Sequence, residues 1–435
     1  MNPDTTVLLV GANDEAVQKA RQLGLHVLLL QHPSKFSDEQ ERLADHTRVL
    51  DYTDWAEVRP VAEELKASPG FGAALSLTEA GLENAGRIND LFGLGGTGFE
   101  VAHRIRDKGA MRLHLAGLDP AAPAAALLLK REDLDVFAGR HGYPFVVKPT
   151  DGTASLGVFR VAGPEDADRV WAEVERLRGT RTDRVSTLFV LRDFLMEEYV
   201  DGPEFSVESF SFAGRHVVVA ITEKFVDPRH FAELGHAVPA RLEADAAQQV
   251  RKCVRRFLDL VGIRDGVCHT EVRIGARGPA IIESHNRIAG DAITDLVRGA
   301  YGIDLVAHAL GWPFGLVPEL PDSPEAHAGA STRFLVGEAG RVESVSGVEE
   351  VRGQPDVLDV RLSAGPGDTV RDLKDNWDRL GLVAVTGPDT TSAILRGAEL
   401  IRDTLEIRIA RTDGGSARAR VAGREALTQD TGDAA

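Results

Sequence analysis

The sequence predicts a mixed α/β and α+β fold, with a layered α/β unit first and antiparallel sheets after it. Three observations indicate this fold. Short apolar segments at residues 6–10, 26–30 and 73–77 alternate with helical segments, which is the rhythm of an α/β layer. Strand-like segments farther along the chain flank a Gly-Pro turn and a turn near Gly278. Residues 244–261 carry one apolar stripe, which is typical of a helix packed against a sheet.

The order of these elements predicts three structured regions and a tail. We expect an N-terminal α/β domain at 1–105, a two-lobed central region at 106–320 and a smaller α+β subdomain at 321–410. Residues 411–435 are polar and rich in Gly and Ala, which predicts a disordered tail.

Composition narrows the class of protein. The net charge of −17 disfavours a nucleic acid or an anionic membrane as partner. Only two cysteines occur, Cys253 and Cys268, so a disulfide scaffold is not expected and the cytoplasm is the simplest compartment. No apolar run approaches the ~20 residues that span a bilayer.

Two strand-like arms around Gly278 carry the most informative acidic pair. A three-residue loop, Ala276-Arg277-Gly278, would pair Glu271 with Glu283 and Arg273 with Ile281. Paired side chains on adjacent strands have Cβ atoms about 4.5–5.5 Å apart, so two carboxylates there repel unless a cation lies between them. Mg²⁺ in nucleotide sites uses such carboxylates together with phosphate oxygens. The alternative is a different register with two solvated glutamates.

The run Ser284–Asp291, directly after this hairpin, concentrates polar and cationic residues at a strand end. Arg287 can clamp a carboxylate or a phosphate with two parallel hydrogen bonds. A surface ion pair is the alternative for Arg287, and His285 fits either a metal or an ordinary hydrogen bond.

Lys148 ends a strand and precedes a loop, 150–157, that contains Gly152 and Gly157. A lysine beside flexible backbone amides suits a polyphosphate, and glycines let the backbone approach it closely. The loop lacks the G-x-x-x-x-G-K-[ST] pattern, which disfavours a P-loop NTPase. Near the N-terminus, Gly11 belongs to no G-x-G-x-x-G fingerprint, so a dinucleotide site is weakly supported.

A third segment, 197–204, reads as two strands around a Gly-Pro turn. Glu204 and Glu208 share one face by period-two alternation, and an acid there can accept hydrogen bonds from ribose hydroxyls. An exposed hairpin face is the alternative.

In this order, these segments resemble the ATP-grasp superfamily over roughly residues 1–310. His269-Thr270-Glu271 and the spacing from Glu283 to Arg287 are most similar to the L-amino acid ligases that make dipeptides and to carnosine-synthase-like enzymes. The resemblance implies ATP and Mg²⁺, with Mn²⁺ as a substitute, and a set of site residues. Those for the nucleotide are Lys108, Lys148, Ser155, Gly157, Glu197, Glu198, Val200 and Glu204; those for the metal are Glu271 and Glu283.

The implied activity is ATP-dependent joining of a carboxylate to an amine through an acyl-phosphate, with Arg287, Glu271 and Glu283 as catalytic residues. The substrates would be an amino acid or related carboxylate and an amine, contacted by Glu79, Arg287 and His269. Analogy favours a homodimer. Glu79 follows the apolar strand at 73–77, so it can either hold a substrate ammonium group or stabilise the start of a helix.

One departure from the family pattern concerns the metal. Many ATP-grasp enzymes have Glu-x-Asn, with the Asn as a metal ligand, whereas here His285 holds that position and Asn286 follows it. Two other functions stay open: activation of bicarbonate, as in biotin carboxylase, and a nucleotide-binding regulatory protein without turnover.

Overall fold

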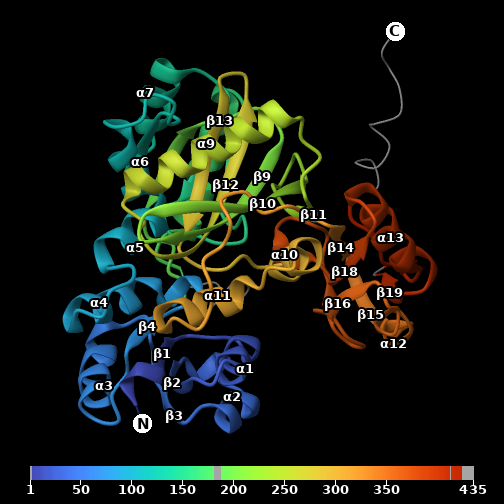
Figure 1. Cartoon of the computed structure of the whole chain (residues 1–435). Helices are drawn as coiled ribbons and strands as arrows, with labels where there is room; N and C mark the ends of the chain where they lie inside the picture. The colour runs from blue at the N-terminus through green and yellow to red at the C-terminus, as the bar shows by residue number, and fades with distance from the viewer. Residues whose placement is uncertain (1, 181–187, 412, 424–435) are drawn as a thin grey trace.

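A computed structural model describes residues 2–180, 188–411 and 413–423, which form four sheets flanked by helices (Figure 1). The predicted combination of an α/β layer with antiparallel sheets is confirmed. Within the described ranges, none of the helices combines the length and the apolar character that crossing a membrane requires.

The N-terminal layer is a parallel sheet in the order β3-β2-β1-β4. Val7 and Leu9 face one hydrophobic core while Leu8 and Val10 face another, so β1 is buried on both sides. The layer comprises β1 (Thr6–Val10), β2 (His26–Gln31), β3 (His46–Val49), β4 (Ala73–Leu75), α1 (Asp14–Gln22), α2 (Asp38–Leu43), α3 (Trp55–Ala67) and α4 (Leu82–Phe92). A 3₁₀ turn, η3 (Glu79–Gly81), follows β4 at the carboxyl edge of the sheet.

A small antiparallel sheet in the order β5-β8-β6-β7 forms the first lobe of the central region. Asp107 caps the N-terminus of α6 by accepting a hydrogen bond from the Ala110 amide, which places Lys108 at the start of that helix. The elements are α5 (Phe99–Arg106), α6 (Lys108–Ala116), β5 (Ala125–Leu128), α7 (Glu132–His141), β6 (Phe145–Pro149), β7 (Phe159–Val161), α8 (Ala167–Leu177) and β8 (Phe194–Glu198).

The large sheet runs β13-β12-β9-β10-β11-β14-β18-β16, with β21 beside β14. α9 (Ala244–Val261) lies across one face of it, and its predicted bounds are confirmed. The remaining elements that build the sheet and its cover are β9 (Glu204–Phe212), β10 (Arg215–Val226), β11 (Glu233–Val238), β12 (Gly266–Gly275), β13 (Gly278–His285), α10 (Ile293–Tyr301), α11 (Leu305–Gly311), β14 (Gly329–Val336), β16 (Val357–Leu362), β18 (Gly381–Gly387) and β21 (Arg420–Val421).

The C-terminal part of the chain contributes four strands to this large sheet, β14, β16, β18 and β21, and builds a separate sheet, β17-β15-β19-β20. A sheet therefore runs continuously across the expected boundary at residue 320. The separate sheet and its helices are β15 (Gly340–Ser346), β17 (Thr369–Val370), β19 (Glu406–Arg411), β20 (Ser416–Arg418), α12 (Val348–Arg352) and α13 (Thr390–Asp403). A short turn, η6 (Asn376–Asp378), precedes β18.

The expectation of a disordered tail from residue 411 is wrong for residues 413–423. β20 pairs with β19 and β21 pairs with β14, and the side chain of Ala422 is fully buried. The Ala422 carbonyl also accepts a hydrogen bond of 2.7 Å from buried Arg333. Backbone pairing stabilises this polar segment, and amino-acid composition alone does not reveal such pairing. Residues 412 and 424–435 lie outside the described ranges.

The hairpin β12–β13 confirms one predicted pair and corrects another. Glu271 lies directly opposite Glu283, as predicted. Arg273, however, pairs with Ala280 rather than with Ile281, and the loop has two residues between Gly275 and Gly278 instead of three. A register shift between Glu271 and Val272 accounts for both, because a bulge adds one residue to one strand and moves all later pairs by one.

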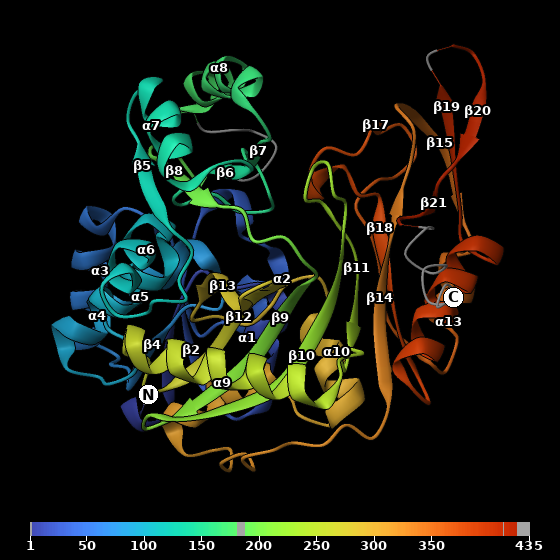
Figure 2. The ribbon, with the colours of Figure 1, turned by 90° about the horizontal axis from the view of Figure 1, so that it is seen from above.

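The segment 197–204 is not a hairpin. β8 belongs to the small sheet and β9 to the large one, so the Gly-Pro turn joins the two lobes. A Cβ on Gly202 would lie 2.0 Å from the carbonyl oxygen of Ile274, so only glycine allows this close passage beside β12. Figure 2 shows the small sheet on one side of the large sheet and the C-terminal strands β15, β19 and β20 on the other.

Candidate active site

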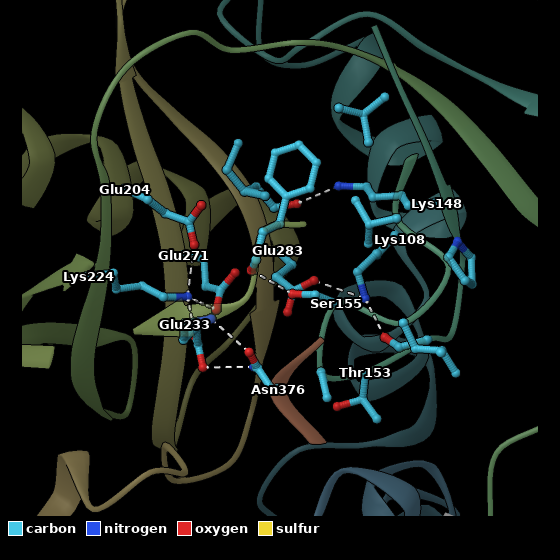
Figure 3. A pocket seen from close by; sticks show the side chains of 18 of the residues that line it. Lys108, Lys148, Thr153, Ser155, Glu204, Lys224, Glu233, Glu271, Glu283 and Asn376 are labelled. Atoms are coloured by element: carbon cyan, nitrogen blue, oxygen red, sulfur yellow. Dashed lines mark hydrogen bonds and ion pairs between the residues drawn. The ribbon is translucent and has the colours of Figure 1, made fainter. Parts of the chain in front are cut away.

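A cavity of about 400 Å³ lies between the small sheet and the large sheet (Figure 3). It is within the usual size range for small-molecule sites, and the lobe connection forms one of its walls. Most of the predicted site residues line it: Lys108, Lys148, Ser155, Glu197, Glu198, Val200, Glu204, His269, Glu271, Glu283 and Arg287. Gly157 and Glu79 are not among its lining residues.

The paired glutamates of the hairpin project into this cavity, each beside a lysine. Glu271 Oε1 lies 2.5 Å from Lys224 Nζ, and Glu283 Oε2 lies 2.9 Å from Lys108 Nζ. Burial would raise the pKa of Glu271, but Lys224 and His269 outweigh it and hold the pKa well below its usual range. Burial likewise opposes the charge on Lys224, but Glu204, Glu233 and Glu271 raise its pKa well above the usual value. Lys224 and His269 therefore favour the charged form of Glu271, and Lys108 forms an ion pair with Glu283.

This donor set fits a divalent metal ion. Carboxylate oxygens are the ligands that Mg²⁺ prefers, and a cross-strand pair presents them from one direction. The two lysines now supply the positive charge that a metal ion would supply. Many ATP-grasp enzymes have an Asn metal ligand two residues after the second glutamate, and neither His285 nor Asn286 lines this cavity together with the two glutamates. His285 is absent from its lining, and Asn286 lines a separate cavity of about 70 Å³.

The two predicted phosphate lysines lie on the small-lobe side of the cavity. Lys148 Nζ is 2.8 Å from Glu197 Oε1, and Lys108 Nζ donates to the carbonyl of Gly152 at 2.9 Å. Burial, aided by Arg112 and Lys108, lowers the pKa of Lys148 despite the attraction of Glu197. In contrast, Glu283, Glu79 and Glu271 outweigh burial at Lys108 and raise its pKa. Both side chains are almost fully enclosed, so a polyphosphate beside them would meet charge that water does not screen.

The loop between Lys148 and β7 covers one side of the cavity. Ala154 and Ser155 have positive φ angles of 58° and 61°, and Ser155 Oγ donates to the carbonyl of Phe231 at 3.0 Å. This bond connects the small-lobe loop to the turn between β10 and β11. Gly157, at φ 72°, packs beside Pro149 and supports the loop from behind rather than facing the cavity.

The lobe connection carries the residues expected to meet the base and the ribose. Glu197 is enclosed by Arg112 and Lys148, so its side chain is an internal counter-ion. Glu198 pairs with Arg277, and the Val200 carbonyl accepts from Arg273. Glu204 is 2.9 Å from Lys224. The side chain of Glu197 is thus engaged inside the protein, and its backbone lies in β8, which is paired with β5 and with β6.

Glu79 comes from the N-terminal layer and meets the run after β13. Its Oε2 is 3.1 Å from Arg287 Nη2, and its Oε1 is 3.5 Å from His285 Nε2 and makes no hydrogen bond among the described residues. Burial opposes ionisation, but His285, Arg287 and Lys108 outweigh it and lower the pKa of Glu79 to about 2. No backbone N–H donates to the Glu79 carboxylate in the described chain, so the contacts do not support a helix-capping role for its side chain.

The two histidines of this region differ in charge. Burial lowers the pKa of His285 to about 4, so its ring is neutral at neutral pH. Burial also disfavours the charge on His269, but Glu208 at 2.9 Å and Glu271 outweigh it and raise the pKa to about 9. His269 is therefore a cation at the cavity wall, held by two acids.

Several cavity residues were missed by sequence reasoning: Lys224, Glu233, Asn376, Trp377 and Arg379. Arg112, the ion-pair partner of Glu197, was missed as well. Lys224 lies within the largely buried strand β10, and a charge placed there could have signalled a site. η6 lies far along the chain, and no local pattern links it to the hairpin.

Comparisons with known proteins agree with this geometry. A model of the ATP-grasp domain matches residues 141–295, and a model of the L-amino acid ligase C-terminal domain 2 matches residues 333–410. The chain therefore contains an ATP-grasp domain. It also carries a C-terminal domain of the type found in L-amino acid ligases.

Relatives are similar to different extents. Uncharacterized protein y4rH of Sinorhizobium fredii is 27% identical over 87% of this chain and 77% of its own length. Alanine–anticapsin ligase of Bacillus subtilis strain 168 is 26% identical over 60% of this chain and 58% of its own length. Carnosine synthase 1 of Gallus gallus is 30% identical over 47% of this chain, but the match covers only 22% of that protein.

A crystal structure of an L-amino acid ligase from Bacillus licheniformis has the same fold. Its TM-score is 0.79 at 21% identity, and the match covers 94% of this chain and 99% of that one. A biotin carboxylase from Campylobacter jejuni superimposes with a TM-score of 0.68 at 15% identity. The fold alone therefore does not separate amino-acid ligation from bicarbonate activation.

Proposed function

We propose that this chain is an ATP-dependent ligase that joins the carboxylate of an amino acid, or of a close analogue, to an amine. The observation that carries the proposal is the Glu271–Glu283 pair, which faces the cavity together with Lys108 and with Lys148 beyond it. A site that combines acidic metal ligands with enclosed lysines suits phosphoryl transfer from a nucleotide to a carboxylate. The matched C-terminal domain supports an amino acid as substrate.

ATP would lie between the two sheets. Lys108, Lys148 and the loop around Ser155 would contact its phosphates, and the backbone of residues 197–200 would meet the base. Glu204 would accept hydrogen bonds from the ribose. Glu271 and Glu283 would hold Mg²⁺, for which Mn²⁺ can substitute, and the ion would neutralise charge on the phosphate oxygens during transfer.

The reaction has two steps. A carboxylate oxygen of the first substrate attacks the γ-phosphorus of ATP, the bond to the bridging oxygen breaks, and ADP leaves with that electron pair. The amine nitrogen then attacks the carbonyl carbon of the acyl-phosphate. Inorganic phosphate leaves with the electrons of the C–O bond, and the amine releases a proton. Arg287 stabilises the negative oxygen that forms in this second step.

Water must be kept from the acyl-phosphate, because hydrolysis would release it as unreacted carboxylate. The loop over the cavity can do this, since Ser155 already reaches across to Phe231 at the β10–β11 turn. Closure then depends on contacts between the small lobe and the large sheet rather than on the loop alone.

A screen of substrates tests the proposal. ADP release should require an amino acid and a second amine together, and mass spectrometry of the mixture should find an amide of the two. ADP release that depends on bicarbonate alone would replace this function with bicarbonate activation. The absence of any substrate-dependent turnover would favour a regulatory protein. The expected homodimer and the cytoplasmic location stay predictions.

Glu79 provides a test of substrate recognition. We propose that it holds the ammonium group of the first amino acid while Arg287 holds the carboxyl end, so Glu79→Gln should raise KM for that amino acid about 10-fold or more. The melting temperature should fall as well, because the buried carboxylate that pairs with Arg287 is lost, so the recognition role is judged from KM. Glu83→Gln, in the neighbouring helix, is the control. A lower melting temperature with an unaltered KM would assign Glu79 a structural role instead.

A further inference from the structure

Arg379 and Asp291 form an ion pair at the wall of the cavity. Nη1 and Nη2 of Arg379 lie 2.8 and 3.0 Å from the two carboxylate oxygens of Asp291, and both residues line the cavity. Arg379 comes from the C-terminal region just after η6, whereas Asp291 ends the run that carries Arg287. The C-terminal region therefore places a guanidinium group directly in the site.

The orientation of Arg379 is fixed from three sides. Its Nε donates to the Asn376 carbonyl at 2.8 Å, and its Cζ lies 3.9 Å from the centre of the Phe334 ring. Its Nη1 is 3.6 Å from Glu233 Oε2. A planar guanidinium held in this way loses little freedom when it binds a second carboxylate. Each terminal nitrogen has two N–H groups, and no further carboxylate partner of Nη2 is found among the described residues.

Beside the Arg379–Asp291 pair, one buried polar atom has no hydrogen-bond partner within the described chain. His236 has no exposed surface, its Nε2 is 3.4 Å from Asp291 Oδ2, and its Nδ1 has no hydrogen-bond partner within the described chain. Glu233, His236 and Asp291 could place their ligand atoms around one metal ion, within 4.8 Å of one another. Arg379 already contacts both acids, however, and its charge occupies the place that such an ion would need. The cluster therefore suits an organic ligand better than a second metal.

We propose that the Arg379–Asp291 pair is the receptor for the acceptor substrate, and that this substrate is an α-amino acid with a free carboxylate. This inference rests on the proposed function and deepens it. The ligand carboxylate would bind Arg379 and its amino group would approach Asp291, so a zwitterion would match both charges of the pair. Trp377, half exposed beside Arg379, offers an apolar surface to the side chain of the acceptor.

The position of the pair suits a second substrate. Asp291 is four positions after Arg287 in the sequence, so their Cα atoms are at most about 14 Å apart. Glu233 bridges from Arg379 to Lys224, which contacts Glu271 at 2.5 Å. The receptor is thus connected to the reacting centre by one chain of ion pairs, and Arg287 and Arg379 line the same cavity.

The test separates activation of the first substrate from capture of the second. In Arg379→Met, kcat/KM for the acceptor amino acid should fall about 10- to 150-fold, the range expected for losing hydrogen bonds to a charged group. The amide of the same amino acid lacks the carboxylate, so its kcat/KM should change less than about 3-fold. Hydroxylamine, which traps acyl-phosphates as hydroxamates, should report unchanged activation of the first substrate.

Two further variants keep this test decisive. Arg379→Lys retains the charge without the planar fork, so its defect should lie between those of wild type and Arg379→Met. Arg371→Met, at an exposed arginine of the same region, should behave as wild type. Equal losses with the amino acid and its amide, or a hydroxamate yield that falls in parallel, would overturn the assignment. Wild-type protein without any hydroxamate would instead contradict the proposed function.

Discussion

Replacing Glu271 or Glu283 by glutamine is expected to lower the rate of amide formation at least ~100-fold, the scale of losing a major electrostatic element. Glutamine keeps the shape of the side chain but removes one charge from the pair that faces the cavity. The fold should survive, because Lys224 still pairs with Glu204 and Glu233 after the loss of Glu271. The measurement is turnover over a range of Mg²⁺ concentrations, together with the melting temperature.

Glu343→Gln serves as a control for this pair, since Glu343 lies exposed on β15, in a different sheet. It should match wild type in both readouts. Near-normal turnover of either cavity variant at low Mg²⁺ would mean that the hairpin does not hold the metal ion.

Lys148→Ala is expected to weaken ATP binding about 10- to 100-fold, because a charge-assisted hydrogen bond to phosphate is lost. The Lys148→Ala variant should lose little stability. Glu197 keeps its ion pair with Arg112 at 2.5 Å, and burial already disfavours the charged form of Lys148 by lowering its pKa. Calorimetry gives the dissociation constant, and thermal unfolding gives the stability.

Lys130→Ala is the matched control, because Lys130 is exposed on the same lobe. If ATP affinity is unchanged in Lys148→Ala, Lys148 does not contact the phosphates. Lys108→Ala tests the other lysine in the same way, but it also frees Glu283, so its effect on Mg²⁺ dependence should be larger.

The acidic pair was predictable because it depends on local structure. A turn at Gly278 and two strand-like arms are enough to place Glu271 opposite Glu283. The bulge after Glu271 was not predictable, because no turn residue marks its position in the sequence. For this reason the predicted partner of Arg273 was wrong, although the predicted partner of Glu271 was right.

The site residues that could not be predicted depend on contacts between segments that are far apart in the sequence. Arg379 meets Asp291 across 88 residues, and Arg112 meets Glu197 across 85. Lys224 gathers Glu204, Glu233 and Glu271 from three different strands. Strand order in the large sheet brings these residues together, and a single sequence does not fix that order. The prediction of a disordered tail was wrong for a similar reason, because β21 pairs with β14, which lies much earlier in the sequence.

Transfer of oxygen from substrate to phosphate tests the central claim most directly. The amino-acid carboxylate is labelled with ¹⁸O, and the released inorganic phosphate is analysed by mass spectrometry. An acyl-phosphate route predicts one ¹⁸O in the phosphate for each amide formed, because the attacking carboxylate oxygen leaves with the phosphate. Amide formation with unlabelled phosphate would contradict the route, since the carboxylate would then never have carried the γ-phosphoryl group.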